Sequence, residues 1–212
     1  MSNPRILLVD DHPVFRAGLK QILALELKQA EFGEGANAAE AMTLAPQQPW
    51  NLAILDIDMP GRSGLELLAD LKALQPQLPV LLLSMHEEED YAVRALRAGA
   101  AGYVSKESSF SEIVAAVRKV LGGGMYISPF LAEQLAKGVG TRSDGPPHLH
   151  LSNREFQILC KLAAGKPLKE IAAELGVSIK TVSTYRSRVL EKLGLQSNAD
   201  LVRYALHHRL IT

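Results

Sequence analysis

Five polar residues stand at the ends of short apolar runs in the first half of the chain. They are Asp10, Asp11, Asp56, Ser84 and Lys106. Three carboxylates in one cleft repel each other and take up protons unless a cation shares the site. A hard divalent cation such as Mg²⁺ takes oxygen ligands and keeps waters for a phosphate, while a lysine and a hydroxyl suit an incoming anion. These residue types predict phosphoryl transfer, with Asp56 as the nucleophile that becomes an acyl phosphate.

The apolar runs before these residues are predicted to be strands, because they are short and bounded by turn residues. Five helices are predicted to alternate with them. The strands are Arg5–Val9, Ala30–Glu34, Leu52–Leu55, Pro79–Leu83 and Gly102–Val104, and the helices start at Pro13 or span Ala38–Ala45, Ser63–Leu74, Glu88–Ala98 and Ser109–Leu121. This alternation predicts an α/β fold, a doubly wound five-stranded parallel sheet. Ligands bind beyond the carboxyl ends of such strands, so the polar residues are expected to converge there.

The zero net charge of the 212 residues is a cancellation between an acidic front and a basic tail. From His148 to Thr212 there are ten Lys or Arg and five Asp or Glu, which gives +5 and leaves −5 for the rest. This asymmetry indicates two units with different partners, the tail meeting nucleic acid. The single Cys160 excludes an internal disulfide and fits a reducing compartment. With neither a signal peptide nor a membrane-length apolar run, the chain is expected to be cytoplasmic, without a membrane partner.

The basic tail has the pattern of a small all-α, four-helix helix-turn-helix domain. Its third helix is capped by Ser178 and buries Val182, Val189 and Leu193. Short hydroxyls on the other side suit base edges, and cations suit phosphates. The candidate DNA-binding residues are Lys169, Lys180, Thr181, Ser183, Thr184, Ser187, Arg188 and Lys192. The alternatives are an ordinary solvated helix face and a tail that binds only protein.

Between the two units the sequence predicts a flexible linker, because Gly138–Pro147 is rich in Gly and Pro and poor in apolar residues. A short helix is predicted from Ser128 to Lys137. The expected domains are therefore 1–122, a linker with a short helix at 123–147, and 148–212.

From about Pro4 to Leu121 the chain resembles the receiver domain of two-component response regulators. The resemblance rests on the five strand-end residues and on Tyr103, three residues before Lys106. It implies a flavodoxin-like fold with strand order 2-1-3-4-5, in which Asp56 accepts a phosphoryl group from a histidine kinase, a phosphotransfer domain or a small phosphodonor. It also implies no enzyme activity beyond the promotion of its own aspartyl phosphorylation and dephosphorylation.

The same resemblance assigns roles to the residues around Asp56. Ser84 and Lys106 contact the phosphoryl oxygens, and Tyr103 is the switch that turns inward when Ser84 moves. The implied ligands of Mg²⁺ or Mn²⁺ are Asp11, Asp56, the backbone carbonyl of Asp58 and, through water, Asp10. His12 and His86 are interpreted as rim residues rather than metal ligands. One departure is Glu107, which stands where many receivers have proline.

A rival for the first half is a phosphatase of the haloacid dehalogenase type, because Asp56-Ile57-Asp58 is a D-x-D motif after an apolar strand. Phosphatases of this type usually carry the motif after their first strand, and Asp10-Asp11 upstream favours the receiver.

From Leu151 to Ile211 the tail resembles a LuxR-type domain. The matching residues include Leu151-Ser152, Arg154-Glu155, Gly165, Lys169–Ala172, Val177-Ser178, Thr181-Val182, Lys192-Leu193 and Leu210-Ile211. With the receiver, this resembles the NarL/FixJ class of response regulators, and Val182–Arg186 looks closest to its BvgA/GacA-like branch. The resemblance implies a transcription factor that binds double-stranded promoter DNA as a homodimer when phosphorylated. Ser183 and Tyr185 replace the usual Lys and His, so a DNA sequence preference does not carry over.

Overall fold

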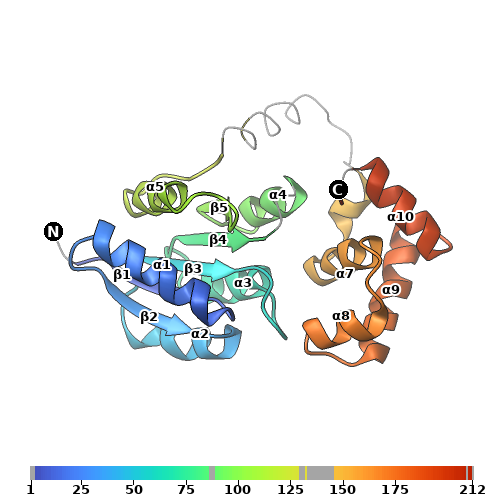
Figure 1. The fold of residues 1–212 in the computed structure, drawn as a ribbon, viewed down its shortest axis with the longest axis horizontal. Coiled ribbons are helices and arrows are strands. Elements are labelled where there is room, and N and C mark those ends of the chain that lie inside the picture. The colour runs from blue at the N-terminus through green and yellow to red at the C-terminus, as the bar shows by residue number, and fades with distance from the viewer. Residues whose placement is uncertain (1–2, 86–88, 129–131, 133–145, 209, 212) are drawn as a thin grey trace. The chain divides into compact units, whose positions relative to one another are not determined.

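A computed structural model of the 212-residue chain describes residues 3–85, 89–128, 132, 146–208 and 210–211 (Figure 1). The chain divides into two compact units, Met1–Lys137 and Gly138–Thr212. No helix among the described residues is long and apolar enough to cross a membrane.

The first unit is built on a parallel sheet with the strand order β2-β1-β3-β4-β5. The strands are β1 (Arg5–Val9), β2 (Glu31–Gly35), β3 (Leu52–Asp56), β4 (Val80–Ser84) and β5 (Gly102–Ser105). This topology confirms the predicted doubly wound sheet and its order. The strands β2 to β5 each end one residue later than predicted, and β2 and β4 also begin one residue later.

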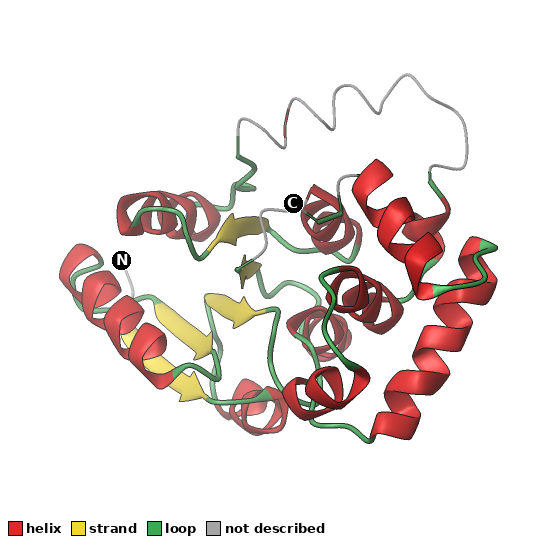
Figure 2. Ribbon diagram, turned by 45° about the vertical axis from the view of Figure 1, so that its right-hand side comes forward, coloured by secondary structure: helices red, strands yellow, loops and turns green. Residues whose placement is uncertain are grey.

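Helices cover both faces of this sheet (Figure 2). They are α1 (Pro13–Glu26), α2 (Ala38–Leu44), α3 (Gly64–Leu74), α4 (Glu89–Arg97) and α5 (Phe110–Leu121), with a 3-10 turn η1 (Ala45–Gln47) after α2. Because side chains alternate along a strand, Ile6 and Leu8 share one core cluster with Leu19 of α1 and Ile113 of α5. The intervening Leu7 is equally buried and faces the other side.

Parallel pairing brings the carboxyl ends of the central strands to one edge of the sheet. Asp56 is level with Leu83, the residue before Ser84. The backbone N–H of Lys106 donates to the carbonyl oxygen of Ser84 at 2.7 Å. Asp10 follows β1, which pairs with β3. The sequence positions that end these strands are therefore neighbours in space.

The chain after α5 returns to the edge of the sheet. Tyr126 forms an isolated parallel bridge with Gly102, and its N–H donates to the carbonyl oxygen of Ala101 at 2.8 Å. Its hydroxyl donates to Oε1 of Glu112 at 2.9 Å. Burial and this carboxylate raise the pKa of Tyr126 to about 12. A Cβ on residue 102 would lie 2.9 Å from the carbonyl oxygen of Tyr126, so this close approach requires glycine.

The described part of the second unit consists of helices and the turns between them. Its elements are η2 (Pro147–His150), α7 (Asn153–Ala163), α8 (Leu168–Glu174), α9 (Ile179–Leu193) and α10 (Asn198–His207). Ser152 and Glu155 form the capping box of α7, and the Ser178 side chain caps α9. Gly176, with φ +61°, lies in the turn between α8 and α9. The helix-turn-helix arrangement predicted from the sequence is thus confirmed.

The predicted helix from Ser128 to Lys137 and the predicted linker Gly138–Pro147 lie almost entirely outside the described residues. Both stay predictions, as do the domain boundaries at 122/123 and 147/148.

Candidate functional site

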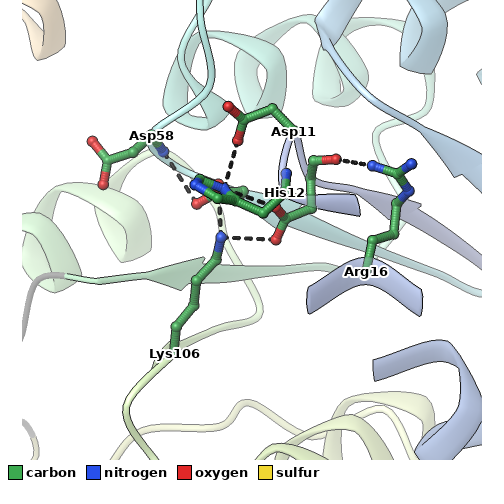
Figure 3. Close-up of polar contacts among 7 residues, drawn as sticks. Asp11, His12, Arg16, Asp58 and Lys106 are labelled. Atoms are coloured by element: carbon green, nitrogen blue, oxygen red, sulfur yellow. Dashed lines mark hydrogen bonds and ion pairs between the residues drawn. The ribbon is translucent and has the colours of Figure 1, made fainter. Parts of the chain in front are cut away.

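The ammonium group of Lys106 lies between two buried carboxylates (Figure 3). Its Nζ is 2.7 Å from Oδ2 of Asp10 and 2.7 Å from Oδ2 of Asp56. The side chains of Lys106, Asp10 and Asp56 are 3%, 6% and 1% exposed. A buried charge is tolerated only when it is paired, and here one cation serves two anions. The cluster is therefore poised to accept further positive charge.

The electrostatics of Asp56 follow from this arrangement. Burial raises the pKa of its carboxyl group to about 6, against the opposing effect of the Lys106 charge, and the negative charge of Asp10 adds to the increase. The carboxylate that the sequence predicts to be the nucleophile is thus poorly solvated and incompletely neutralised.

The loop after β3 fixes the orientation of Asp56. The backbone N–H of Asp58 donates to Oδ1 of Asp56 at 3.2 Å. The carboxylate of Asp58 points away from Lys106 in Figure 3. The start of α3 approaches so closely that a Cβ on Gly64 would lie 2.1 Å from the carbonyl oxygen of Asp56. Sequence reasoning missed the role of Gly64, because nothing local to it signals a tertiary contact.

Two further predicted residues lie near this edge of the sheet. Ser84, the last residue of β4, is fully buried. Tyr103, on β5, is 7% exposed, so its side chain is directed inward in this structure. Its predicted movement between an outward and an inward position stays a prediction.

His12 lies closer to the carboxylates than the sequence indicated. Its Nδ1 is 2.9 Å from Oδ1 of Asp11, 3.3 Å from Oδ1 of Asp10 and 3.8 Å from Oδ2 of Asp56. The ring is still 63% exposed, which agrees with a position at the rim. His86 lies outside the described residues.

The donor set fits a divalent cation. Carboxylate oxygens of Asp10, Asp11 and Asp56, with one ring nitrogen of His12, all lie within 4.8 Å of one another. Oxygen ligands at such spacing suit Mg²⁺ or Mn²⁺.

A second layer of charges supports the turn that carries Asp10 and Asp11. The guanidinium group of Arg16 donates to the carbonyl oxygen of Asp10, and its Nε lies 3.4 Å from Oε2 of Glu34. Lys20 also hydrogen-bonds Glu34, and this bond, with the Arg16 charge, lowers the pKa of Glu34 despite the opposing effect of burial. Sequence reasoning missed Arg16, whose only signal is its place one helical turn after His12.

In the second unit, α9 presents the predicted polar face. Lys180, Thr184, Ser187 and Arg188 are exposed, Thr181 and Ser183 are partly buried, and Lys169 is exposed on α8. The hydroxyls of Thr184 and Ser187 donate to backbone carbonyls one turn earlier, at 3.0 and 3.2 Å. Their oxygens can still accept hydrogen bonds. Lys192 differs from the rest, because its Nζ lies 2.6 Å from the buried carboxylate of Glu155.

Comparison with known proteins agrees with this geometry. The family described as "Response regulator receiver domain" matches residues 6–118, and "Bacterial regulatory proteins, luxR family" matches residues 149–205. The transcriptional regulatory protein UhpA of Escherichia coli is 42% identical over 201 residues, covering 93% of this chain and 95% of UhpA. The response regulator GacA of Pseudomonas aeruginosa is 35% identical over 208 residues, covering 98% of this chain and 97% of GacA.

The chain belongs to the NarL/FixJ class of response regulators. Among solved structures, RcsB from Salmonella enterica serovar Typhimurium, bound to promoter rprA in the presence of phosphomimetic BeF3-, superimposes with a TM-score of 0.67. It is 25% identical, covering 96% of this chain and 98% of that one. GacA proteins are among the relatives, as the sequence indicated, although UhpA is more identical.

Membership of this class decides between the two interpretations of the first half of the chain, a receiver domain and a phosphatase of the haloacid dehalogenase type. The D-x-D motif Asp56–Asp58 begins at the last residue of the third strand of a receiver sheet, so the phosphatase interpretation is wrong. The protein is a transcription regulator rather than an enzyme.

Two buried charged residues of the LuxR-type domain are structural. Arg154 is 6% exposed and donates to Oε1 of Gln157 at 2.8 Å and to the carbonyl oxygen of Leu175 at 3.0 Å, so it binds the end of α8. Glu155 accepts from the N–H of Ser152 at 2.8 Å. In this response regulator, Arg154 thus holds the end of α8 against α7, and Glu155 holds α9 there through Lys192.

Proposed function

We propose that Asp56 accepts a phosphoryl group from a histidine kinase or a phosphotransfer domain, and that this modification controls binding of the LuxR-type domain to promoter DNA as a dimer. The observation that carries the proposal is the position of Lys106, whose Nζ lies 2.7 Å from both Asp10 and Asp56 at the carboxyl edge of the sheet. A regulator of this kind acts in the cytoplasm.

In the transfer step, a carboxylate oxygen of Asp56 forms a bond to phosphorus. The bond from phosphorus to the donor atom breaks, and the donor leaves with the electron pair. Lys106, already at the carboxylate, is within reach of the phosphoryl oxygens that carry the developing charge. Ser84, on the adjacent strand, supplies a hydroxyl donor to the same group.

The residues that would hold Mg²⁺ or Mn²⁺ are Asp11, Asp56, the backbone carbonyl of Asp58 and, through water, Asp10. When bound, such an ion neutralises the carboxylates and orients the phosphate. Asp10, Asp11 and Asp56 together carry more negative charge than Lys106 neutralises, which is why this acidic cluster supports the assignment.

The effect of phosphorylation on DNA binding follows from the charge that it adds. A phosphoryl group brings nearly two negative charges to Asp56, draws Lys106 and Ser84 toward it, and favours the buried position of Tyr103. The proposed DNA contacts are Lys169 of α8 and seven residues of α9, namely Lys180, Thr181, Ser183, Thr184, Ser187, Arg188 and Lys192. In RcsB, the solved complexes contain promoter DNA and BeF3-, which supports the same coupling here.

The test uses the purified chain with acetyl phosphate and Mg²⁺. We expect intact-mass measurement to show the addition of one phosphoryl group, located on Asp56 by peptide mapping, and Asp56→Asn to abolish it. Asp70→Asn, which removes a partly buried α3 carboxylate that pairs with Arg62, is the matched control and is expected to leave phosphorylation unchanged. Phosphorylation of the Asp56→Asn variant at the wild-type rate would falsify the assignment.

DNA binding and dimerisation are tested by promoter footprinting with and without acetyl phosphate, combined with measurement of the protein's size in solution. We expect phosphorylation to increase both dimer content and protection of specific sites. A tail that binds only protein is the second candidate. It predicts no preferred duplex and no steep loss of binding with salt, whereas DNA contacts by lysine and arginine give such a loss through counterion release.

A further inference from the structure

Lys106 has a third neighbour besides its two carboxylates. The ring of Phe15, in the first turn of α1, lies with its centroid 4.8 Å from the Lys106 Nζ. An ammonium group within about 6 Å of a ring centroid is attracted by the negative face of the aromatic ring. The attraction strengthens when the pair is removed from water, and the Lys106 side chain is only 3% exposed.

Phe15 is itself in contact with a second aromatic ring. Its ring stacks on that of Phe110, the first residue of α5, with centroids 6.3 Å apart and an interplanar angle of 27°. The two helix starts that flank the site, α1 and α5, are thereby joined by an aromatic pair. A ring fixed in this way offers a stable surface to the cation.

The ring differs from the carboxylates in one respect that bears on the transfer. When Asp56 is phosphorylated, one of the two anionic partners of Lys106 changes its chemical form and size. The face of Phe15 does not change, so the attraction between ring and ammonium persists while Lys106 exchanges the Asp56 carboxylate for phosphoryl oxygens. Such a partner keeps the cation in the pocket without competing for its hydrogen bonds.

We propose that Phe15 is a positioning residue for phosphoryl transfer that acts through Lys106, holding its ammonium group over the acidic pocket by a cation–π contact. This inference rests on the proposed function of Asp56. It assigns Phe15 no contact with the phosphoryl group.

The first test measures the rate of phosphorylation by acetyl phosphate, a small donor that needs no docking surface. We expect Phe15→Leu, which keeps an apolar side chain but removes the ring, to slow phosphorylation about three- to tenfold. Phe15→Tyr retains an aromatic face and is expected to restore most of the rate. Phe32→Leu is the matched control, because Phe32 packs against the same core cluster from β2, and it is expected to leave the rate unchanged.

A double-mutant cycle separates positioning from general loosening of the core. In a Lys106→Gln background the cation is absent, so Phe15→Leu is expected to cause no further loss. An equal loss from Phe15→Leu in both backgrounds, or no loss in either, overturns the proposal.

A second readout does not depend on phosphorylation. Acylation of lysines by an amine-directed reagent, followed by peptide mass spectrometry, reports the accessibility of Lys106. We expect Phe15→Leu to increase Lys106 labelling severalfold and Phe32→Leu to leave it unchanged, and unchanged labelling in Phe15→Leu would contradict the inference. If the wild-type chain fails to be phosphorylated on Asp56, the proposed function fails, and the labelling result still decides whether Phe15 holds Lys106.

Discussion

Nζ of Lys192 lies 2.6 Å from Oε2 of Glu155, which is 37 residues earlier in the chain. This contact ties α9 to the first turn of α7. Glu155 is 3% exposed, so Lys192 neutralises a carboxylate that has almost no access to water. A residue that the sequence assigned to DNA contact therefore also stabilises the domain.

We expect Lys192→Met to destabilise the helical unit by about 1–2 kcal/mol, because it leaves a buried carboxylate without its cation. Urea denaturation followed by far-UV circular dichroism measures the change. Fluorescence of the single Trp50, in the receiver, should show an unchanged transition. Lys180→Met, an exposed residue of the same helix, is the control and is expected to stay within about 0.5 kcal/mol of wild type. Equal effects of both variants would contradict this role for Lys192.

In DNA binding, the Lys180 variant is expected to show the larger effect, whereas in stability the Lys192 variant does. Lys180→Met removes an exposed cation. It should reduce the magnitude of the slope of log affinity against log salt concentration by about one, the change expected for the loss of one phosphate contact. Lys192→Met should change this slope less, since its charge is engaged by Glu155. Affinity measured by fluorescence anisotropy at several salt concentrations checks both. A larger slope change for Lys192 would mean that the ion pair opens on DNA.

The stability of the helical unit should depend on pH through Glu174. Burial acting alone would raise the pKa of Glu174, but hydrogen bonds from Lys161 and Lys166 lower it below the ordinary value of 4.5. A lowered pKa means that this stabilisation is present above 4.5 and is lost as pH falls below it. Circular dichroism melts should show that wild type loses stability below that pH more steeply than Glu174→Gln. Glu191→Gln, on the exposed side of α9, should retain the wild-type slope.

Removing one of the two carboxylates that share Lys106 should stabilise the receiver. In the presence of EDTA, Asp56→Asn is expected to raise the free energy of unfolding by about 1–3 kcal/mol, because a buried anion without full compensation is lost. Added Mg²⁺ should stabilise wild type but not Asp56→Asn. Urea denaturation monitored by Trp50 fluorescence measures both. If Mg²⁺ stabilises the two proteins equally, the ion binds elsewhere.

Two glycines of the receiver make a matched pair. A Cβ on Gly64 would lie 2.1 Å from the Asp56 carbonyl oxygen, whereas one on Gly18 of α1 meets nothing within 4 Å. Gly64→Ala is expected to destabilise the receiver by about 2–3 kcal/mol, since backbone must move. Gly18→Ala is expected to stabilise it by about 0.5–1 kcal/mol through helix propensity. Thermal unfolding distinguishes the opposite signs.

The convergence of Asp10, Asp56 and Lys106 could be predicted from the sequence because a parallel sheet leaves little freedom. Apolar runs identify the strands, short crossovers require parallel order, and the ends of neighbouring strands then meet. The capping box of Ser152 and Glu155 could also be predicted from the sequence, because it depends only on a spacing of three residues.

Other parts of the site depend on contacts between distant segments. The approach of His12 to the carboxylates, the need for glycine at position 64 and the stacking of Phe15 on Phe110 are set by how helices dock on the sheet. Propensity and periodicity carry no information on such distances. The ion pair of Lys192 was missed for the same reason, because an exposed lysine on a basic helix has the same sequence pattern whether or not it is paired.

The bridge between Gly102 and Tyr126 also bears on self-association. β5 is the last strand of the sheet, and an open edge strand can recruit a strand from another molecule and start aggregation. The N–H of Tyr126 already occupies the carbonyl oxygen of Ala101 at that edge. Gly102→Ala would push Tyr126 away and uncover these backbone groups. The glycine at the start of β5 therefore also protects the molecule against edge-to-edge polymerisation.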